Sequence, residues 1–582
     1  MPDVPSFAVD DGFWYSIPSH LADEVVVGSL VRVPLSGRRV RGWVVELGDG
    51  PGRALKEIAG LSGTVPVFDG PMFRSLLWMA IHYVAPVAVL LSKATPPNLP
   101  KKAGPWELSP EAPDSDHPLT EVTAVAARGG KVPAQAIVGS WREGEWIPGL
   151  GPVLTAGRSA MVVAGSAAEV RQVATAARSR FGEAVVEASG DDNARLTEAW
   201  SDSQVAGRLL VGTPRVACWK VSDLSVVVVL EEGRRSMKER QTPTLHVRET
   251  VRARSLLEGV IPVFLGPTPS VETLSGGSEV RKVGGRAWGL VEVVDRSDEP
   301  PGSGFLSDRV KAALRATATQ GERCFVFTHR RSGAASMRCV SCRAIRSCGR
   351  CGALLGRVEE CPRCGASVGP CVRCGSVEFE EMGTVPQRLV AEINRSLGRT
   401  VAAVHPADNL VTVGTERDLA SLPMVTLSVA ADADGMLMGP GHRQSEEALR
   451  QLARVAGAVR RGTGARMMVQ TSHPDSDLMS ALRRGDPIPY LERVLVSRAR
   501  EGMPPAVEMI ALELRDKVPE GVDGDLESLP ATTVLGPAAV DEGKRWLLSG
   551  DLAAARRQLR GLVGRWREEG ATVRVDADPI DL

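Results

Sequence analysis

Eight of the ten cysteines in this chain lie within one window of 36 residues and form four C-x-x-C pairs. These ligand candidates are Cys339 and Cys342, Cys348 and Cys351, Cys361 and Cys364, and Cys371 and Cys374. Two cysteines separated by two residues can bind one metal ion through both sulfurs, and two such pairs complete a tetrahedral site. The spacing therefore predicts two zinc sites per chain. A disulfide framework or a redox-active pair is the alternative interpretation.

A zinc ion held by four thiolates has no open coordination position, so we expect these ions to be structural and not catalytic. Residues 321–375, which contain the pairs, carry ten arginines and only three acidic residues. Such a basic surface favours binding to phosphates. The alternative is a solvated surface on a small domain that the metal folds.

A second set of residues suited to binding nucleic acid lies near the N-terminus. It combines three consecutive aromatic residues with four arginines that have no acidic neighbour in sequence. The set consists of Phe13, Trp14, Tyr15, Arg32, Arg38, Arg39 and Arg41. Arginines bind phosphates and aromatic rings stack on bases, so this set is typical of a site for single strands or strand ends. A hairpin with an aromatic core and a solvated rim is the alternative.

The elements that must position these residues can be read from the hydrophobic pattern. Residues 30–35 and 40–46 alternate apolar with polar residues around Ser36-Gly37, which predicts a hairpin. Further strands are expected at 160–164, 208–211, 225–230, 261–265, 324–327, 411–413, 424–430 and 466–470. Ser166 and Glu169 form a capping box that should open a helix after the first of these. Strands separated by helices predict parallel sheets.

The expected fold class is a multidomain α/β protein with a β-rich N-terminal domain, two α/β lobes and an α+β C-terminal domain. The second lobe carries the cysteine module as an insert. The predicted boundaries are 1–102, a linker at 103–135, a first lobe at 136–275, a linker at 276–300, a second lobe at 301–487 with its insert at 337–376, and a C-terminal domain at 488–582.

Composition limits the possible partners and compartments. The 582 residues contain 70 Lys+Arg and 70 Asp+Glu, so a histone-like polycation and an acidic solvating chain are both excluded. No basic stretch followed by an apolar run begins the chain, and the apolar run 226–230 is far shorter than a membrane span. Clustered cysteines fit a reducing compartment. We therefore expect a cytoplasmic protein without a membrane partner.

Four C-x-x-C pairs inside the second of two α/β lobes resemble one family, the primosomal replication-restart helicases PriA. Further motifs along the chain carry the same resemblance. They are Phe13–Pro18, Val31–Pro34, Gly212-Thr213, Glu231-Glu232, His246-x-Arg248-Glu249, Thr268-Pro269, Arg330–Gly333, Gly383-Thr384, Val534–Pro537 and Asp576–Pro579. The spacing of the cysteine pairs is the most specific of these features.

This resemblance implies two RecA-like lobes that hydrolyse ATP and move 3′ to 5′ on DNA, and an N-terminal domain that holds the 3′ end of an arrested strand. It also implies that the outer two cysteine pairs share one zinc ion and the inner two share the other. The implied partners are branched or single-strand-containing DNA and the proteins that load the replicative helicase.

The chain departs from the family in the ATPase motifs. A phosphate-binding loop needs G-x-x-x-x-G-K-[ST], but Lys131 is the only lysine between Lys102 and Lys220. The segment expected to hold the loop, 149–157, has none. Leu230 replaces the aspartate that would organise Mg²⁺, and Ala458 replaces an arginine. These losses remove most of the charge stabilisation of phosphoryl transfer, so we predict an inactive motor.

Several remaining residues are expected to be structural. Glu231 and Glu232 have no lysine partner, His246 is expected to serve structure, and Cys218 and Cys324 lie in or beside apolar segments as buried thiols. Gly414-Thr415-Glu416-Arg417 replaces the family's Gly-Thr-Gln-Met. Whether ATP and Mg²⁺ still bind without hydrolysis is left open.

We predict a replication-restart protein that binds stalled or branched forks and helps to reload the replicative helicase, without helicase activity of its own. The alternatives are an ATP-dependent 3′–5′ helicase with a divergent nucleotide site, and a zinc-stabilised interaction scaffold. Trp14 stands where the family commonly has aspartate. The winged-helix domain of the family is reduced or absent, so fork recognition is expected to differ.

Overall fold

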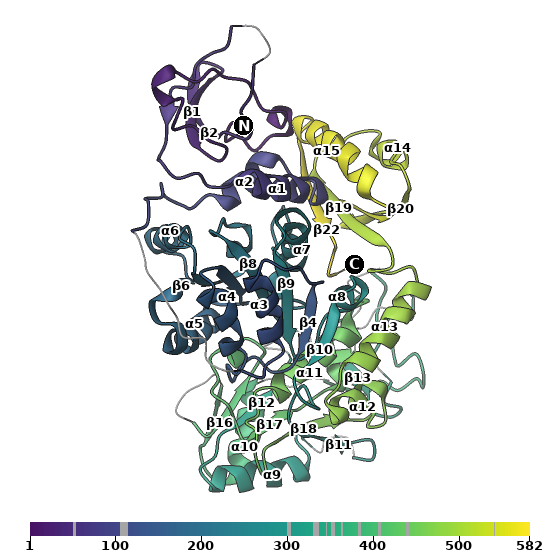
Figure 1. The fold of residues 1–582 in the computed structure, drawn as a ribbon. Coiled ribbons are helices and arrows are strands. Elements are labelled where there is room, and N and C mark those ends of the chain that lie inside the picture. The colour runs from purple at the N-terminus through teal and green to yellow at the C-terminus, as the bar shows by residue number, and fades with distance from the viewer. Residues whose placement is uncertain are drawn as a thin grey trace. The chain divides into compact units, whose positions relative to one another are not determined.

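A computed structural model gives the fold (Figure 1) and describes residues 1–50, 54–104, 115–299, 304–329, 337–344, 346–350, 355–361, 365–381, 386–404, 409–437, 441–540 and 542–581. The chain divides into two compact units. The first contains residues 1–283 and 492–582, and the second contains residues 284–491. None of the helices in these ranges is both long and apolar enough to cross a membrane.

The N-terminal module begins with a three-stranded antiparallel sheet in the order β2-β1-β3. Its elements are η1 (Phe7–Val9), η2 (Ser19–Leu21), β1 (Leu30–Leu35), β2 (Arg38–Trp43), β3 (Gly60–Leu61), α1 (Gly70–His82) and α2 (Val87–Ala94). The predicted hairpin is therefore present, and Ser36 and Gly37 both adopt positive φ in its turn. Only the first part of this module is β-rich, because two helices follow the sheet.

The first lobe is built on a seven-stranded parallel sheet in the order β10-β4-β9-β8-β5-β7-β6. Its strands are β4 (Gln135–Val138), β5 (Ser159–Val163), β6 (Val185–Ala188), β7 (Leu209–Gly212), β8 (Leu224–Leu230), β9 (Ile261–Gly266) and β10 (Glu279–Lys282). Its helices are α3 (Leu119–Ala127), η3 (Ile147–Leu150), α4 (Gly151–Thr155), α5 (Ala167–Phe181), η4 (Gly182–Ala184), α6 (Asn193–Asp202), η5 (Pro214–Cys218), η6 (Arg235–Met237), α7 (Val247–Glu258) and α8 (Val271–Ser275).

Local sequence explains why α5 begins where it does. The Ser166 side chain accepts a hydrogen bond from the backbone N–H of Glu169 and donates one to the Glu169 carboxylate, which completes the predicted capping box. The apolar residues Val170, Val173 and Ala174 follow at helical spacing and are buried against the sheet.

The second lobe is built on a six-stranded parallel sheet in the order β11-β18-β17-β12-β16-β15. Its strands are β11 (Val291–Asp295), β12 (Cys324–Phe327), β15 (Ala402–Val404), β16 (Val411–Gly414), β17 (Leu427–Ala430) and β18 (Arg466–Thr471). Its helices are α9 (Asp308–Thr319), α10 (Pro386–Leu397), η7 (Asp418–Ala420), η8 (Asp434–Leu437), α11 (Gln444–Ala456), α12 (Asp477–Arg484) and α13 (Ile488–Arg500), whose second half belongs to the first unit. A two-stranded antiparallel sheet, β13 (Met337–Cys339) with β14 (Phe379–Glu381), marks the cysteine module between β12 and α10.

The C-terminal domain is a four-stranded antiparallel sheet, in the order β20-β21-β19-β22, with two helices. Its elements are β19 (Glu508–Asp516), α14 (Val522–Glu527), β20 (Thr532–Val540), β21 (Gly543–Gly550), α15 (Ala553–Glu568) and β22 (Ala571–Ala577). Within the first unit, α1 packs against both α7 of the first lobe and α15 of this domain (Figure 1). The α+β pattern expected from sequence is therefore present.

All eight strands predicted after residue 158 are found, with ends that shift by at most three residues. The two predicted linkers differ from the structure. Residues 103–135 include α3, which packs on η3 and α4 of the first lobe, and residues 276–300 include β10 of one lobe and β11 of the other. Helix α3 is short and β10 is an exposed edge strand. Both lie among polar or glycine-rich residues, so the average composition of these segments indicates neither a helix nor a strand.

Candidate metal centre, nucleic-acid interface and nucleotide site

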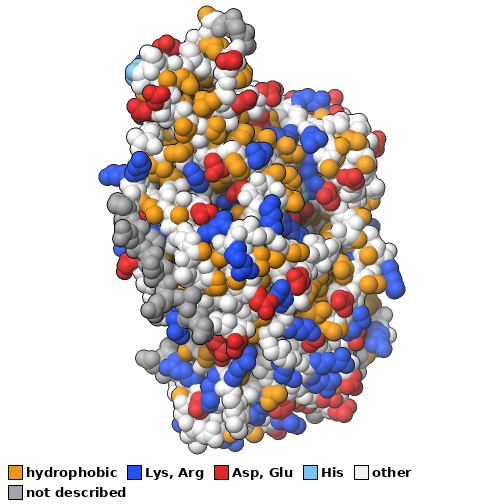
Figure 2. Space-filling view, in the orientation of Figure 1, with side chains coloured by type: hydrophobic (Ala, Val, Ile, Leu, Met, Phe, Trp, Pro, Cys, Tyr) orange, Lys and Arg blue, Asp and Glu red, His pale blue; other side chains and the backbone are white. Residues whose placement is uncertain are grey.

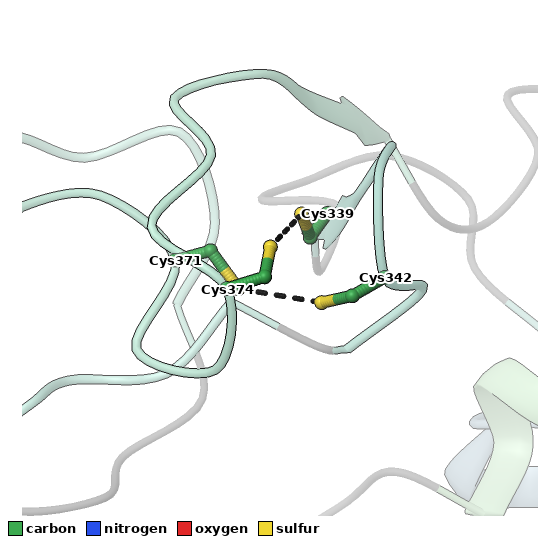
Figure 3. Close-up of side chains that lie close together, drawn as sticks. All are labelled: Cys339, Cys342, Cys371 and Cys374. Carbon is green, nitrogen blue, oxygen red and sulfur yellow. Dashed lines mark hydrogen bonds between the residues drawn. The ribbon is translucent and has the colours of Figure 1, made fainter.

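The outer two cysteine pairs come together in the structure. Cys339 ends β13, which pairs with β14, and this pairing brings the first knuckle beside the last one. The Sγ atoms of Cys339 and Cys374 are 3.4 Å apart, those of Cys342 and Cys371 are 3.6 Å apart, and all four lie within 4.8 Å of one another (Figure 3). A tetrahedral ion bound to four sulfurs at about 2.3 Å needs sulfurs about 3.8 Å apart. The four thiols therefore fit a metal ion.

Tight turns hold the knuckles in shape. In three of them, the backbone N–H of the residue after the second cysteine donates to the carbonyl of the first cysteine. That residue has a left-handed conformation in each case: Arg343 (φ 60°), Gly365 (φ 66°) and Gly375 (φ 75°). Gly365 and Gly375 therefore stand where the turn requires a positive φ. Glycine adopts this conformation without steric cost, whereas Arg343 does not.

Hydrogen bonds lower the pKa values of Cys339 and Cys371, whereas for Cys374 the Ser376 backbone lowers the pKa but hydrogen bonds with Cys342 and Cys339 raise it to about 12. Burial raises the pKa of the Cys339 thiol, but hydrogen bonds from the Cys342 backbone and from the Cys374 thiol outweigh burial and lower the pKa to about 6. The backbone N–H of Arg373 likewise lowers the pKa of Cys371. Since thiolates and not thiols bind metals, the turns prepare these sulfurs for an ion.

The inner two pairs are described only in part. Cys348 and Cys361 are buried together with Leu355 in a small cluster. Cys351 and Cys364 lie outside the described residues, as do Arg330–Gly333 and Gly383-Thr384. The second metal site stays a prediction.

Several arginines of the cysteine module are committed to contacts inside their own unit. Arg338 pairs with Glu380 at 2.5 Å, and Arg343 donates to the Glu299 carbonyl at 2.5 Å. Arg346 lies over the Phe379 ring and donates to the Gly356 carbonyl at 3.0 Å. Arg350 and Arg357 are exposed. The basic surface predicted from residue counts is therefore smaller in the structure, because acidic and carbonyl groups distant in sequence reach these arginines.

The N-terminal module contains a pocket of about 450 Å³ on the apolar face of the hairpin. Val31 and Val33 line its floor, and Phe13 and Trp14 lie at its edge with 48% and 43% of their surface exposed. The Tyr15 hydroxyl donates to the Pro34 carbonyl at 3.2 Å, which fixes that ring against β1. Surface hydrophobic side chains of this module are visible in Figure 2. Large exposed aromatics beside a pocket mark a binding surface.

Three of the four predicted arginines, Arg32, Arg39 and Arg41, lie on the other face of the hairpin, whereas Arg38 stands opposite Leu35 on the face of Val31 and Val33. Arg32 and Arg41 are directly opposite in the β1–β2 register, and side chains alternate along a strand, so both point away from the face of Val31 and Val33. Arg41 is paired with Asp3 at 2.7 Å and lies over Trp43. The sequence neighbourhood does not reveal this acidic partner.

Three arginines of the hairpin keep their charge available to a ligand. Arg32, Arg38 and Arg39 are exposed and form no ion pair with any residue that the structure describes. The structure thus places Arg32 and Arg39 on the face opposite the pocket, and Arg38 at the turn on the pocket's own face.

The acidic box of the first lobe lies at the end of β8. Glu232 is buried and accepts hydrogen bonds from the Ser270 backbone N–H at 2.8 Å and from the Thr273 hydroxyl at 2.6 Å. His246 is buried, and its Nδ1 caps α7 by accepting from the backbone N–H of Arg248. The Glu232 contacts link the end of β8 to the start of α8, and His246 caps α7. Both roles are structural, as expected.

In the second lobe, ion pairs join the segment that contains Glu416 to helix α11. Glu416 accepts from Arg450 and from Arg454, in each case at 2.7 Å, and both arginines are buried in α11. Arg450 also pairs with Glu447. Ala458, which stands at the position of the missing arginine, is buried, and its side chain has no polar atom. Cys218 and Cys324, the two cysteines outside the C-x-x-C pairs, are buried as expected, and burial raises the pKa of each thiol to about 12.

Comparisons with known proteins agree with these features. Residues 3–96 match a family model described as the 3′DNA-binding domain of PriA. The replication restart protein PriA of Treponema pallidum is 26% identical over 88% of this chain and 86% of its own length. The probable replication restart protein PriA of Mycobacterium leprae is 23% identical over 97% of this chain and 94% of its own length.

Among solved structures, S. cerevisiae Dbp5 bound to RNA and ADP BeF3 is similar, with 10% identity and a TM-score of 0.36 over 65% of this chain and 87% of that chain. A score this low supports no further argument. The parallel sheets, the thiol cluster and the match of residues 3–96 define a multidomain α/β protein whose N-terminal module is similar to a DNA-binding domain. Over most of its length the chain is similar to the replication restart proteins PriA.

Proposed function

We propose that this chain binds stalled or branched DNA forks through its N-terminal module and acts in replication restart without hydrolysing ATP. The observation that carries the proposal is the match of residues 3–96 to the 3′DNA-binding domain, together with the pocket rimmed by Phe13 and Trp14. The relatives over most of the chain are named for replication restart. Such a role would assign the chain to the cytoplasm of a bacterial cell.

The aromatic residues and the arginines have separate tasks in this proposal. Phe13 and Trp14 present their rings at the pocket, where an unpaired base at a strand end would stack, with Tyr15 holding the pocket wall. Arg32, Arg38 and Arg39 lie outside the pocket and would bind phosphates of the adjoining duplex or strand. Arg41 supports the fold through Asp3 and contributes less to DNA binding.

We further propose that the metal ion is Zn²⁺, since four thiolates in a tetrahedron suit zinc better than the harder divalent ions. Cys339, Cys342, Cys371 and Cys374 would hold one ion, and Cys348, Cys351, Cys361 and Cys364 a second. The ions would fold the module, whose exposed surface would contact proteins that load the replicative helicase.

The experiment is fork binding measured by fluorescence anisotropy on the full chain. The probes are a fork whose nascent strand ends in a 3′ end at the branch, the same fork without that strand, and a plain duplex. We expect the first probe to bind most tightly. Trp14→Ala should weaken its binding by about 5- to 160-fold, because stacking of one base contributes about 1–3 kcal/mol. Leu256→Ala, which removes another exposed apolar side chain of the same unit, is the control.

The arginines are tested by the salt dependence of binding. Replacing Arg32 and Arg39 together by alanine should reduce the slope of log affinity against log salt by about two. Arg180→Ala, an exposed arginine of the first lobe, should leave the slope unchanged. Equal affinity for fork and duplex, or a Trp14→Ala variant that binds like the wild type, would refute the proposal. ATP hydrolysis measured on the same preparation separates it from the helicase alternative, for which fork-stimulated turnover is required.

A further inference from the structure

The loop in the position of a phosphate-binding loop is residues 139–146, which join β4 to η3. Parallel strands β4, β9 and β8 are neighbours, so their carboxyl ends meet at one edge of the sheet. Gly139 donates its backbone N–H to the Gly266 carbonyl, and Glu231 donates its own to the Leu265 carbonyl. The segment 149–157, where the sequence placed this loop, is instead the helical stretch formed by η3 and α4.

Two tryptophans fill this loop. Trp141 and Trp146 are 2% and 1% exposed and belong to the hydrophobic core of the lobe. The Trp141 indole N–H donates to the Glu231 carboxylate at 2.8 Å, and this bond is buried. The Trp146 indole N–H donates to the Trp141 carbonyl at 2.9 Å, which fixes the backbone that presents the first ring.

The backbone N–H groups of the loop are also used internally. A phosphate loop needs several of these groups directed at the ligand, together with a lysine. Here Gly144 donates to the Trp141 carbonyl, Ile147 to the Gly144 carbonyl and Gly149 to the Trp146 carbonyl. No lysine occurs in residues 139–146. The loop therefore lacks the lysine that a triphosphate requires, and the N–H groups of Gly139 and Gly144 already donate to carbonyl groups.

The carboxylate beside the plug is satisfied by the chain itself. Arg234 Nε lies 3.7 Å from Glu231, and Arg234 also binds both carboxylate oxygens of the fully buried Glu169 at 2.8 Å. An added Cβ at Gly266 would lie 3.1 Å from Glu231 Cγ, so packing is close on that side as well. Glu231 holds a left-handed backbone (φ 53°) within these contacts.

We infer that Trp141 is a built-in plug that fills the place beside Glu231 where the phosphates and Mg²⁺ of a nucleotide would bind in a working lobe. The first lobe does not fit ATP and Mg²⁺, and its conformation is set by its own side chains. This inference concerns only the lobe and holds whether or not the N-terminal module binds forks.

The first measurement is thermal unfolding of the full wild-type chain with and without millimolar ATP and Mg²⁺. A ligand that binds only the folded state raises the midpoint, because it stabilises that state by RT ln(1 + [L]/Kd). We expect no shift, and no binding of a fluorescent ATP analogue. A nucleotide-dependent rise of the midpoint would overturn the inference, whatever the result of the fork-binding experiment.

The second measurement compares Trp141→Phe with Trp200→Phe. Trp200 is a fully buried tryptophan of the same lobe whose indole N–H has no hydrogen-bond partner, so its replacement reports the change in ring size alone. Trp141→Phe also removes the donor to a buried carboxylate, and it should lower the midpoint by about 3–6 °C more than the control. Equal shifts for the two variants would overturn the role assigned to the Trp141–Glu231 bond.

Discussion

Glu416 should be essential to the stability of the second lobe, where it stands in place of the glutamine that the family has. Its carboxylate binds Arg450 and Arg454 at 2.7 Å, and the side chains of these arginines are only 5% and 2% exposed. Burial lowers the pKa of Arg450, but Glu416 and Glu447 raise it well above its ordinary value. Glu416→Gln keeps the shape of the side chain and removes the charge that both arginines share.

The size of the effect follows from these contacts. Removing one partner of a fully buried ion pair costs about 3–5 kcal/mol, because the other charge stays buried without compensation. Glu416 is about a quarter exposed, Arg450 retains Glu447, and glutamine can still accept one hydrogen bond. We therefore expect the free energy of local unfolding of α11 to fall by about 2–3 kcal/mol.

Hydrogen exchange of the full chain, followed by mass spectrometry, measures this local free energy. Peptides within 444–456 should exchange about 30- to 160-fold faster in Glu416→Gln, since about 1.4 kcal/mol corresponds to a factor of ten. Asp475→Asn removes an exposed charge 3.9 Å from Arg483 in the same unit, and it should change exchange about twofold or less. An exchange rate in Glu416→Gln within twofold of the wild type would show that the buried arginines do not depend on this carboxylate.

Three further outcomes are expected. His117 is buried, its pKa is lowered to about 4, and its Nδ1 accepts from the Leu119 backbone N–H, so the folded state resists protonation. The free energy of unfolding should therefore fall, by at most about 1.4 kcal/mol per pH unit, as the pH drops from 6.5 to 4, and His117→Gln should flatten this slope in chemical unfolding. Cys371→Ser should lower the zinc content from two ions to one per chain, measured by elemental analysis; an unchanged content would contradict the ligand assignment. Trp43→Phe breaks the buried hydrogen bond from the indole N–H to Thr95 Oγ1 at 2.9 Å and should cost about 1–2 kcal/mol in urea unfolding. In a Thr95→Val background, where this bond is already absent, Trp43→Phe should cost less; an equal cost in both backgrounds would contradict the prediction.

Much of the fold could be predicted from short stretches of sequence. The strands of both lobes are apolar runs bounded by polar turns, and the capping box at Ser166 marks the start of α5, because these signals depend only on neighbouring residues. Five strands of the two lobes, β4, β6, β10, β11 and β15, and the short helix α3 were not predicted, and all of these strands except β4 lie at sheet edges. An edge strand needs little apolar surface, and a helix of nine residues gives a weak periodic signal.

The candidate sites divide in the same way. C-x-x-C spacing is a local property, so the metal ligands could be read directly from the sequence. The partners of the arginines could not, because Asp3 lies 38 residues from Arg41, and Glu380 lies 42 residues from Arg338. The sequence analysis expected the nucleotide-binding loop at 149–157, but in the structure the corresponding loop is 139–146. Its place depends on which strand lies beside β9, and the sequence does not show this.

By itself the sequence determined that this protein has a module of four C-x-x-C pairs suited to binding metal, lobes of alternating strands and helices, and no lysine where a phosphate-binding loop requires one. Only the tertiary structure decided what replaces that lysine and where the DNA-binding candidates face. Trp141 and Glu231 are 90 residues apart in the chain and meet because β4, β9 and β8 are adjacent. Arg32 and Arg39 face away from Val31 and Val33, and Arg38 does not, because the hairpin register sends alternate side chains to opposite faces. Contacts of this kind depend on strand order and register, which local sequence patterns do not specify.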